Sequence, residues 1–333
     1  MQNKTFKAIV VTENVAEENQ SYIASIQQRS IDDLPEHDLL VQVSYSSLNY
    51  KDALSASGNK GVTRSYPHTP GIDAAGTVVA DKSGVFKAGD QVIVTGYDLG
   101  MNTDGGHAEY IRVPAEWAVP LPEGLSLKES MIFGTAGLTA AQSIHALLQK
   151  LSPQDGEILI TGATGGVGSL AVNMLAQLGF KVCALTGKAN VADYLQSLGA
   201  DSVIDRQTFI SENTRPLSKP RWAGVVDTTG GDILASAIKS TKPLGMVTCC
   251  GMVSSPNLSL SVFPFILRGI SLVGIDSQHC PVMLRQLLWH KMANEWKPAT
   301  CSKLASQIAL ADIPVAVEKM LAGRHQGRIL VKV

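Results

Sequence analysis

Glu157-Ile158-Leu159-Ile160-Thr161-Gly162-Ala163-Thr164-Gly165-Gly166-Val167-Gly168 is the stretch that decides the fold of this chain. It begins with β-branched and other apolar residues and breaks into small ones, and apolar residues at helical spacing follow over 169–178. This order predicts a strand, a tight turn and a helix. Such a turn suits a nucleotide pyrophosphate, because glycines let the backbone come close and a helix N-terminus offers N–H groups to anionic oxygens.

The match to the dinucleotide-binding fingerprint is incomplete. Gly165 and Gly168 stand at its second and third places, whereas Ala163 replaces the first glycine. Glycine-rich loops also serve simply as bends in a chain. The context favours a nucleotide site, because a second short apolar run at 179–186 follows the helix at the interval expected for a βαβ unit.

The end of this second strand predicts which nucleotide binds. An NAD site would normally place Asp or Glu there to accept hydrogen bonds from the ribose hydroxyls, but this chain has Thr186-Gly187-Lys188. A hydroxyl, a backbone amide and a cation suit a 2′-phosphate, which favours NADPH, and Arg206 could be a second phosphate clamp. The alternative is that Lys188 and Arg206 are ordinary solvated surface cations.

Composition limits the remaining function classes. The chain has 333 residues, 45% of them hydrophobic and 17% charged, so it can bury substantial cores and suggests two domains. Its net charge of -1 gives no general attraction to nucleic acid or to an anionic membrane. No stretch is apolar over membrane-spanning length and no signal peptide is evident, so we expect a cytoplasmic protein. The five cysteines form no CxxC pair and no zinc-spaced cluster, which predicts reduced thiols and no metal site.

The chain falls into a strand-rich first part and an alternating second part. Short strand patterns at 39–45, 76–80 and 91–95, punctuated by glycines, predict a compact, mainly β unit. From residue 127 onward, helical pieces and then alternating β and α patterns up to residue 275 predict a parallel, doubly wound α/β sheet.

The chain's last residues point back to its first part. Residues 327–333 form a strand pattern with no partner nearby in sequence, so we expect this segment to rejoin the first domain. The predicted division is a catalytic domain at 1–126 and 277–333 and a cofactor-binding domain at 127–276.

Three motifs together resemble one family. They are Ser46-Ser47-Leu48-Asn49-Tyr50-Lys51-Asp52-Ala53, Pro264-Phe265-Ile266-Leu267-Arg268 and Gln326-Gly327-Arg328. With the glycine-rich turn and the more general motifs at 70–78 and 134–137, they resemble the zinc-free, quinone-oxidoreductase-like branch of the medium-chain dehydrogenase/reductase superfamily. Within that branch the resemblance is to the YhdH/YhfP-type family, whose members include NADPH-dependent acrylyl-CoA reductases. It covers nearly the whole chain and implies a GroES-like catalytic domain, a Rossmann domain and a homodimer.

The resemblance also implies which residues contact NADPH. The set comprises the glycine-rich turn, the second strand's end and positions near the nicotinamide: Tyr50, Thr164, Gly165, Gly166, Val167, Thr186, Gly187, Lys188, Arg206, Met252, Ile266 and Ser277. Members of the family carry Ser and Arg where this chain has Thr186 and Lys188. The charge is retained, but a point charge replaces a fork-shaped clamp.

Catalysis without zinc is the chemistry that these residues favour. The segment around Asn49 supplies no thiolate for a catalytic zinc, so plain alcohol oxidation is disfavoured, whereas reduction of a C=C bond conjugated to a carbonyl is feasible. Asn49 could donate to the enolate oxygen, Tyr50 could donate a proton or orient the nicotinamide, and Asp52 could fix a neighbour. The alternative is a local turn in which Asn and Asp bond the backbone and Tyr packs. Arg328 could hold an anionic acyl group or a CoA phosphate, or be a surface charge.

Two isolated histidines complete the candidate list. His68 and His107 stand beside proline and glycine, and a loop role is the simpler interpretation of both.

Three functions follow from these observations. The first is an NADPH-dependent reductase of a small α,β-unsaturated acyl-CoA, with hydride transferred to the β carbon. The second is an NADPH:quinone oxidoreductase, and the third is a non-catalytic NADPH-binding or structural protein.

Overall fold

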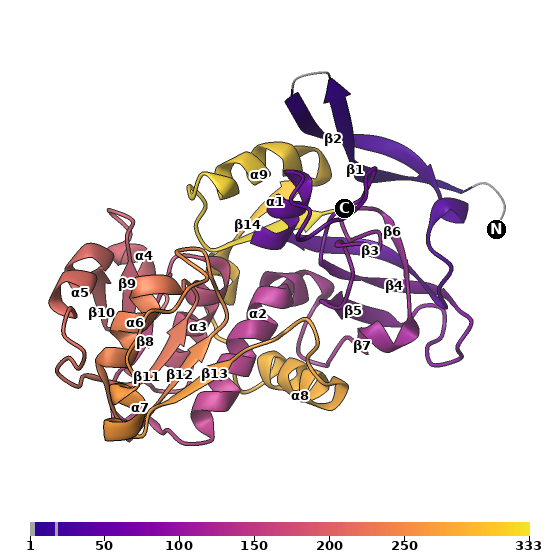
Figure 1. Cartoon of the computed structure of the whole chain (residues 1–333). Helices are drawn as coiled ribbons and strands as arrows, with labels where there is room; N and C mark the ends of the chain where they lie inside the picture. The colour runs from indigo at the N-terminus through magenta and orange to yellow at the C-terminus, as the bar shows by residue number, and fades with distance from the viewer. Residues whose placement is uncertain (1–3, 17–18) are drawn as a thin grey trace. The chain divides into compact units, whose positions relative to one another are not determined.

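The chain forms two compact units in the computed structural model, which describes residues 4–16 and 19–333. The first unit comprises Met1–Thr135, Gln278–Val282 and Ala305–Val333, and the second comprises Ala136–Ser277 and Met283–Leu304. Figure 1 shows the chain from indigo at its N-terminus to yellow at its C-terminus.

These units differ from the predicted division mainly over residues 283–304, which belong to the second unit. The physical reason is local packing. The 3-10 helix η4 (Cys301–Leu304) packs against α3 (Gly166–Gln177), and the Asn173 side chain donates a hydrogen bond to Thr300 Oγ1 at 2.8 Å. Sequence patterns do not report such contacts between distant segments.

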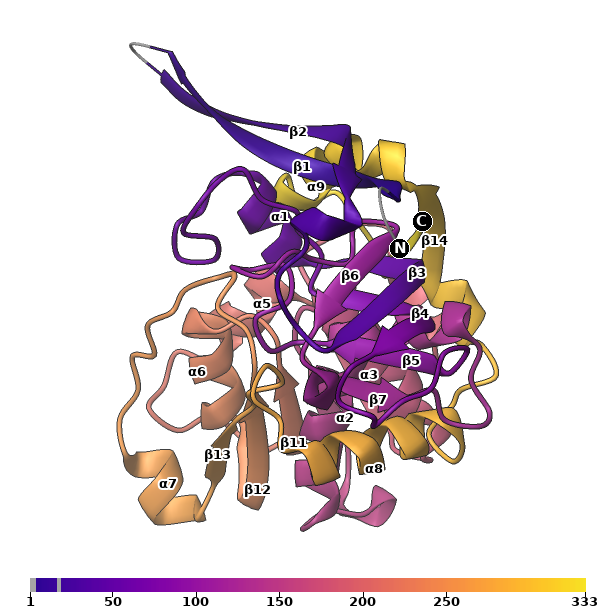
Figure 2. The same cartoon turned by 90° about the vertical axis from the view of Figure 1, so that its right-hand side faces the viewer.

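The first unit is built around a mainly antiparallel sheet. Within the described residues, the strand order is β14-β15-β3-β4-β5-β7, with β6 also paired to β3. A separate hairpin of β1 and β2 extends away from this sheet (Figure 2). The strands are β1 (Thr5–Ala16), β2 (Asn19–Ser30), β3 (Leu39–Leu48), β4 (Asp73–Asp81), β5 (Gln91–Thr95), β6 (Tyr110–Val113), β7 (Ala118–Pro120), β14 (Ala305–Ala309) and β15 (Arg328–Lys332).

Strand register brings the C-terminus of the chain to the candidate catalytic motif. β15 runs antiparallel to β3 with Ile329 opposite Leu48 and Leu330 opposite Ser47. This register places Arg328 beside the end of β3, where α1 (Tyr50–Ala56) begins. Helix α9 (Ile313–Leu321) packs against α1 in the same unit.

The second unit has the predicted parallel sheet, with strand order β10-β9-β8-β11-β12-β13. Its strands lie within the alternating β and α patterns predicted up to residue 275. The central strands β8, β9 and β11 are buried apolar runs, whereas the edge strands β10 and β13 are only partly buried. The strands are β8 (Ile158–Ile160), β9 (Val182–Thr186), β10 (Ser202–Asp205), β11 (Trp222–Asp227), β12 (Thr241–Cys249) and β13 (Ser271–Gly274). With α3 the helices are α4 (Ala192–Ser197), α5 (Arg206–Glu212), α6 (Gly231–Lys239), α7 (Phe263–Arg268) and α8 (Val282–Ala293).

Helix α2 (Leu127–Leu148) covers the helical pieces predicted from residue 127, and a glycine breaks it. Gly134 adopts φ 52° and ψ −154°, so the helix is interrupted there. Among the described residues, α2 is the one helix long and apolar enough to cross a membrane by length and composition alone, so the prediction that no stretch is apolar over membrane-spanning length is wrong. Its apolar window is 78% buried inside the protein, as in a core helix.

Candidate active site

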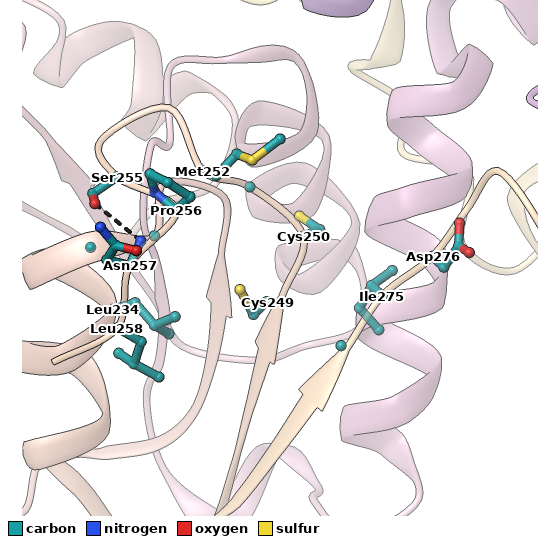
Figure 3. Close-up of a pocket in the computed structure, with 14 residues that line it drawn as sticks. Leu234, Cys249, Cys250, Met252, Ser255, Pro256, Asn257, Leu258, Ile275 and Asp276 are labelled. Atoms are coloured by element: carbon teal, nitrogen blue, oxygen red, sulfur yellow. Dashed lines mark hydrogen bonds between the residues drawn. The ribbon is translucent and has the colours of Figure 1, made fainter. Parts of the chain in front are cut away.

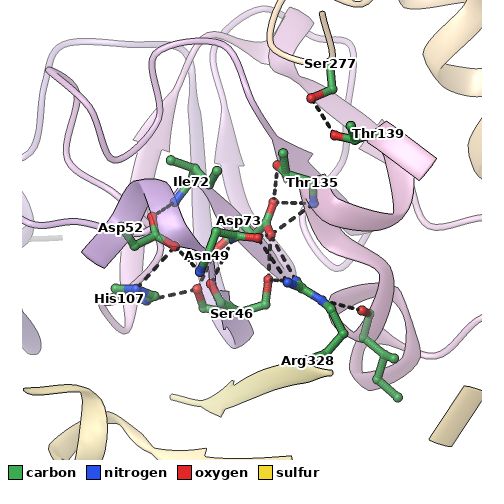
Figure 4. Close-up of polar contacts among 12 residues, drawn as sticks. Ser46, Asn49, Asp52, Ile72, Asp73, His107, Thr135, Thr139, Ser277 and Arg328 are labelled. Atoms are coloured by element: carbon green, nitrogen blue, oxygen red, sulfur yellow. Dashed lines mark hydrogen bonds and ion pairs between the residues drawn. The ribbon is translucent and has the colours of Figure 1, made fainter. Parts of the chain in front are cut away.

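A buried carboxylate, Asp73 at the start of β4, organises the polar centre of the first unit (Figure 4). It accepts hydrogen bonds from Ser47 Oγ at 2.5 Å and from Asn49 Nδ2 at 2.8 Å. Thr135 donates to it twice, from Oγ1 at 2.6 Å and from its backbone N–H at 2.8 Å. A carboxylate removed from water needs such donors, because a buried charge without them destabilises the folded protein by about several kcal/mol.

Arg328 supplies the positive charge of this centre and is 2% exposed. Its guanidinium donates to the Ile132 carbonyl at 2.9 Å and to Ser47 Oγ at 2.7 Å, and its Nη2 lies 3.7 Å from Asp73 Oδ2. Burial lowers the pKa of Arg328, and the charges of Asp73 and Asp52 oppose that effect. The structure therefore engages Arg328 with protein groups, and the alternative of a surface charge is wrong. The predicted contact with an acyl group or a CoA phosphate stays a prediction. The sequence around Arg328 does not indicate that this arginine is buried.

The Asn49 side chain is held at both ends of its amide. Its Nδ2 donates to Asp73, and its Oδ1 accepts from Arg328 Nη1 at 3.1 Å. These opposite charges fix which end of the amide faces which partner. Donors held in place before the reaction are the kind that stabilise developing negative charge at the lowest reorganisation cost.

A glycine is required where α2 passes this centre. A Cβ on Gly134 would lie 2.4 Å from Asp73 Oδ2 and 2.8 Å from Ser47 Oγ. The positive φ of Gly134 is also a conformation that other residues rarely adopt. The glycine break in the sequence thus marks the close approach of the backbone to a buried carboxylate.

Asp52 fixes the backbone around Asn49. It is fully buried, and its carboxyl oxygens accept from the N–H of Asn49 at 2.7 Å and of Ile72 at 2.8 Å. Burial, followed by the charge of Asp73, raises the pKa of Asp52 to about 7. Its predicted catalytic role stays a prediction.

Tyr50 is the first residue of α1 and directly follows Asn49, the N-cap of that helix. Its side chain is 42% exposed, in contrast with the buried side chains of Asn49 and Asp52. Of the predicted catalytic residues it is therefore the one most accessible to a ligand.

The sequence reasoning missed Asp73, Ser47 and Thr135 as site residues, and it treated His107 as a loop residue. His107 does lie in a loop but is fully buried, and its Nε2 is 3.8 Å from Asp52 Oδ2. These four residues come from separate segments, so no spacing in the sequence relates them.

In the second unit, most of the predicted cofactor residues share the carboxyl edge of the parallel sheet. Thr164 to Val167 follow β8, Thr186 to Lys188 end and follow β9, and Arg206 follows β10. Met252 and Ser277 follow β12 and β13 at the same edge. Ligands of open α/β sheets bind outside this edge.

The glycine-rich turn has the geometry that a pyrophosphate site needs. Gly165 is the N-cap of α3, so the first N–H groups of this 12-residue helix point out of its N-terminus. A Cβ on Gly168 would lie 2.4 Å from the Gly162 carbonyl oxygen, so the glycine lets helix and strand pack closely.

A second cluster of polar groups follows β9. The Arg206 guanidinium lies against Gly187, where a Cβ would approach its Cζ to 2.9 Å. Thr186 Oγ1 accepts from the Lys188 N–H at 3.1 Å, and burial lowers the pKa of the Lys188 ammonium. The structure thus brings Thr186, Gly187 and Arg206 together, as their proposed role requires.

Ile266 is the exception among the cofactor residues. It lies on α7, 72% exposed, and Arg268 on the same helix donates to the carbonyls of Lys239 and Thr241 at the amino end of β12. Because β12 and β13 are parallel, a helix that precedes β13 lies at the opposite end of the sheet from residues that follow the strands. Within one chain the structure does not bring Ile266 to the other predicted residues.

The carboxyl ends of β11, β12 and β13 border a cavity of about 560 Å³ (Figure 3). Met252, Cys249 and Cys250 line it together with Asp276. Next to it, Ser277 is held by Thr139, whose Oγ1 donates to Ser277 Oγ at 2.8 Å, and by Arg285, which donates to its carbonyl at 3.2 Å.

Comparison with known proteins agrees with both halves of this description. An alcohol dehydrogenase GroES-like domain matches residues 35–123, and a zinc-binding dehydrogenase domain matches residues 166–294. The putative quinone oxidoreductase YhfP of Bacillus subtilis is 46% identical over 91% of this chain and 92% of its own length. The acrylyl-CoA reductase AcuI of Ruegeria pomeroyi is 40% identical over 98% of this chain and 99% of its own length.

This chain belongs to the medium-chain dehydrogenase/reductase family, in its quinone-oxidoreductase-like branch.

Solved structures of this family superpose closely on the chain. The Salmonella enterica yhdH oxidoreductase in complex with NADP has a TM-score of 0.94 at 40% identity, covering 98% of this chain and 99% of that one. Bacillus subtilis yhfP with NAD bound has a TM-score of 0.96 at 43% identity, covering 99% and 100%. The GroES-like and Rossmann architecture predicted from the resemblance is therefore confirmed.

The zinc in the name of the matched domain has no evident ligand set in this member of the family. Across residues 4–16 and 19–333, no group of three or more His, Cys, Asp or Glu side chains could hold a metal ion. The end of β3, where a thiolate would be needed, has Ser46 and Ser47, and both serve the polar centre instead.

The ion pair at this centre makes a first testable prediction. Asp73→Asn keeps the side-chain size but leaves the buried Arg328 without its counter-charge, which typically costs about 3–5 kcal/mol. We expect the free energy of unfolding, measured by urea denaturation, to fall by about that amount. Asp38→Asn, at an exposed carboxylate of the same unit, should change it by less than about 0.5 kcal/mol. Equal effects of the two substitutions would contradict the central role of Asp73.

Proposed function

We propose that this protein is an NADPH-dependent reductase of the C=C bond of a small α,β-unsaturated acyl-CoA. The observation that carries the proposal is the Asn49 amide, fixed between Asp73 and Arg328 and directly followed by the exposed Tyr50. The acyl-CoA substrate class is supported by the names of two relatives, the AcuI of Ruegeria pomeroyi and a probable acrylyl-CoA reductase of Escherichia coli that is 42% identical to this chain.

NADPH is the cofactor that the residues fit. The N-terminus of α3 would hold the pyrophosphate, and Thr186, Lys188 and Arg206 would hold the 2′-phosphate. Met252 and Ser277 would lie near the nicotinamide half, and Tyr50 is proposed to contact it. When bound, NADPH supplies the hydride that adds to the β carbon.

The protein's own groups then have two tasks. A carbonyl conjugated to the C=C bond takes up negative charge as an enolate, and the Asn49 amide is proposed to donate to that oxygen. Tyr50 either donates a proton to the α carbon or holds the nicotinamide ring in place. Asp52, Asp73 and Arg328 keep Asn49 where these steps need it.

Quinone reduction is the second candidate, favoured by the name of the YhfP relative. Both reactions consume NADPH, and neither needs a group beyond those described. A non-catalytic NADPH-binding protein is the third possibility and predicts binding without turnover. The five cysteines are free thiols, which supports the proposed location in the reducing cytoplasm.

Cofactor preference gives the second prediction. We expect NADPH to bind more tightly than NADH, and Arg206→Ala to weaken NADPH binding about tenfold or more, because a charge-assisted bond to the 2′-phosphate is lost. Isothermal titration calorimetry of both cofactors measures this. Arg215→Ala, at an exposed arginine of the same unit, should leave both affinities unchanged. Equal weakening of NADPH and NADH by Arg206→Ala would exclude a 2′-phosphate contact.

Substrate choice gives the third prediction. Purified protein with NADPH should lose the NADPH absorbance when acrylyl-CoA is added, and prior dialysis against a strong chelator should leave the rate unchanged. Loss with a quinone alone would establish the second candidate, and loss with neither substrate would leave the non-catalytic one.

Tyr50→Phe is the variant that connects this assay to the site. If the Tyr50 phenol is the acid, single-turnover reduction should slow by about 10²–10⁴-fold while NADPH affinity is retained. Weakened NADPH binding with a smaller loss of rate would mean that it only positions the cofactor. Tyr22→Phe, which removes a tyrosine hydroxyl on the β1–β2 hairpin, is the matched control and should leave both quantities unchanged.

We also propose that the protein is a homodimer. The support is β13, an edge strand of the parallel sheet, which has exposed apolar side chains near it. They are Leu244 in the neighbouring strand β12, Phe263 and Leu267 on α7, and Leu272 in β13 itself. Unpaired sheet edges with apolar neighbours are places where a second chain can add.

Sedimentation velocity tests the dimer. Wild-type protein should sediment as a dimer, and Leu267→Glu should shift it toward the monomer because a charge is introduced into the apolar surface. Val85→Glu, at an exposed apolar residue of the first unit, should leave the dimer intact. A monomeric wild type would contradict the proposal.

A further inference from the structure

Asp227, the last residue of β11, is a second buried carboxylate and lies in the second unit. Its Oδ1 accepts from Thr161 Oγ1 at 2.7 Å and from Thr229 Oγ1 at 3.0 Å, and its Oδ2 accepts from the Gly230 N–H at 2.8 Å. Among the described residues no lysine or arginine forms an ion pair with it. Unlike Asp73, this carboxylate therefore depends on uncharged donors.

The position of Thr161 links this carboxylate to the glycine-rich turn. Thr161 directly follows β8, and its N–H donates to the Val226 carbonyl at 3.0 Å, so it is still bonded to the neighbouring strand β11. Gly162 follows with φ +58° and begins the turn. The Thr161 side chain therefore lies where the chain leaves the sheet and enters the turn that leads to the N-terminus of α3.

The hydrogen bonds of the Thr161 hydroxyl fix its direction. The Thr228 N–H, which can only donate, donates to Thr161 Oγ1 at 3.0 Å, so the hydroxyl hydrogen of Thr161 is available for the carboxylate of Asp227. In return the Thr228 hydroxyl donates to the Thr161 carbonyl at 2.8 Å. The side chain and the backbone of Thr161 are thus both held by the residues that end and follow β11.

Close packing reinforces these hydrogen bonds. A Cβ on Gly162 would lie 2.4 Å from Thr228 Oγ1 and 2.9 Å from Thr229 Cγ2, so no side chain fits at position 162. Groups packed this closely cannot shift separately without losing contacts. The place of the glycine-rich turn therefore depends on the turn that follows Asp227.

The backbone of Asp227 holds a third segment, the one that follows β12. The Asp227 carbonyl accepts from the Cys250 N–H at 3.0 Å and from the Cys250 thiol at 3.3 Å. A Cβ on the next residue, Gly251, would lie 1.9 Å from the Thr228 carbonyl oxygen. This segment leads to Met252 and lines the cavity at the carboxyl ends of β11, β12 and β13 (Figure 3).

Asp227 thus contacts the segments proposed to hold the two halves of the cofactor. We propose that Asp227 and Thr161 form a positioning pair for NADPH, in which the carboxylate holds the Thr161 hydroxyl and thereby keeps the glycine-rich turn in place relative to the segment after β12. Neither side chain needs to touch the cofactor, since the turn and the helix behind it make the contact. This role rests on the proposed function for the cofactor site, and it does not depend on the substrate.

The charge of Asp227 is accommodated beside another helix. Burial raises the pKa of Asp227, and the hydrogen bonds from Thr161, Gly230 and Thr229 oppose that effect. The N–H groups of Thr229 and Gly230 lead into α6, whose N-terminus carries the positive end of the helix dipole. In α3, all of whose residues are described, the first turn contains no acidic residue. The N-terminus of α3 is therefore left for the anionic cofactor.

Thr161→Val tests the pair with little change in side-chain volume, because it replaces the hydroxyl by a methyl group and keeps the β-branch. Isothermal titration calorimetry should show NADPH binding about tenfold weaker, since the turn loses the bond that holds it. Thr161→Ser keeps the hydroxyl and should bind NADPH within about twofold of wild type. Equal weakening by the two substitutions would show that the hydroxyl is not the group that matters, and would overturn the pair.

Thr248→Val is the matched control for loss of a buried threonine hydroxyl in the same sheet. Thr248 is fully buried in β12, and its hydroxyl donates to the Val225 carbonyl at 3.2 Å. Thr161→Val and Thr248→Val should both lower the midpoint of urea denaturation, but only Thr161→Val should weaken NADPH binding. A similar loss of affinity in the control would mean that binding follows overall stability, and would also overturn the pair.

Asp227→Asn tests the other member of the pair. The amide offers one acceptor oxygen in place of two, so NADPH should again bind about tenfold more weakly. In the double variant with Thr161→Val the loss should be no greater than the larger single loss, because both substitutions break one contact. Losses that multiply to about a hundredfold would show that the two residues act independently. If Asp227→Asn does not fold, the three threonine variants still decide.

The failure of this inference is distinguishable from the failure of the proposed function. Wild-type protein that binds no NADPH would contradict both. Wild-type protein that binds NADPH, with the same affinity in Thr161→Val, would contradict the positioning pair alone. Because binding is the quantity measured, neither result depends on which substrate is reduced.

Discussion

The buried carboxylate of Asp73 is the constraint on which the first unit depends. Taken out of water, it must be matched by donors, and the chain provides them from β3, from Asn49, from the turn of α2 at Thr135 and from the C-terminal strand. Segments hundreds of residues apart in sequence are thereby joined at one point. The requirement explains the glycine at position 134, where no side chain fits beside the carboxylate. It also explains why Arg328 is buried at the first residue of β15.

The second unit depends on a different constraint, which is the binding of an anionic dinucleotide at the carboxyl edge of a parallel sheet. Here the chemistry comes from the backbone, because glycines bring the turn after β8 close and α3 presents its N-terminus. Side chains after β9 and β10 are proposed to add selectivity, and Gly187 leaves room there for the Arg206 guanidinium. The catalytic proposal needs both units, one to carry the cofactor and one to hold the Asn49 amide in place.

Sequence patterns predicted the parallel sheet well because each of its strands is locally encoded. A buried strand such as β9 is predicted by an apolar run between turn residues, and β9 (Val182–Thr186) lies within the predicted run at 179–186. The polar centre was not predictable in the same way. Asp73 and His107 are separated by loops, and their partners are set by strand register and burial. The surface-charge alternative for Arg328 is therefore wrong, because the residue is buried, and its ligand-binding role stays a prediction. Ile266 was grouped with residues that lie at the other end of the sheet.

The central claim is that hydride from NADPH adds to the β carbon of an unsaturated acyl-CoA. Mass spectrometry of the product tests it most directly, using acrylyl-CoA and NADPH deuterated at the transferred position. Our account predicts deuterium on the β carbon of the saturated acyl-CoA and a solvent-derived hydrogen on the α carbon. A saturated product without deuterium on the β carbon, or NADPH oxidation with no saturated acyl-CoA formed, would contradict it.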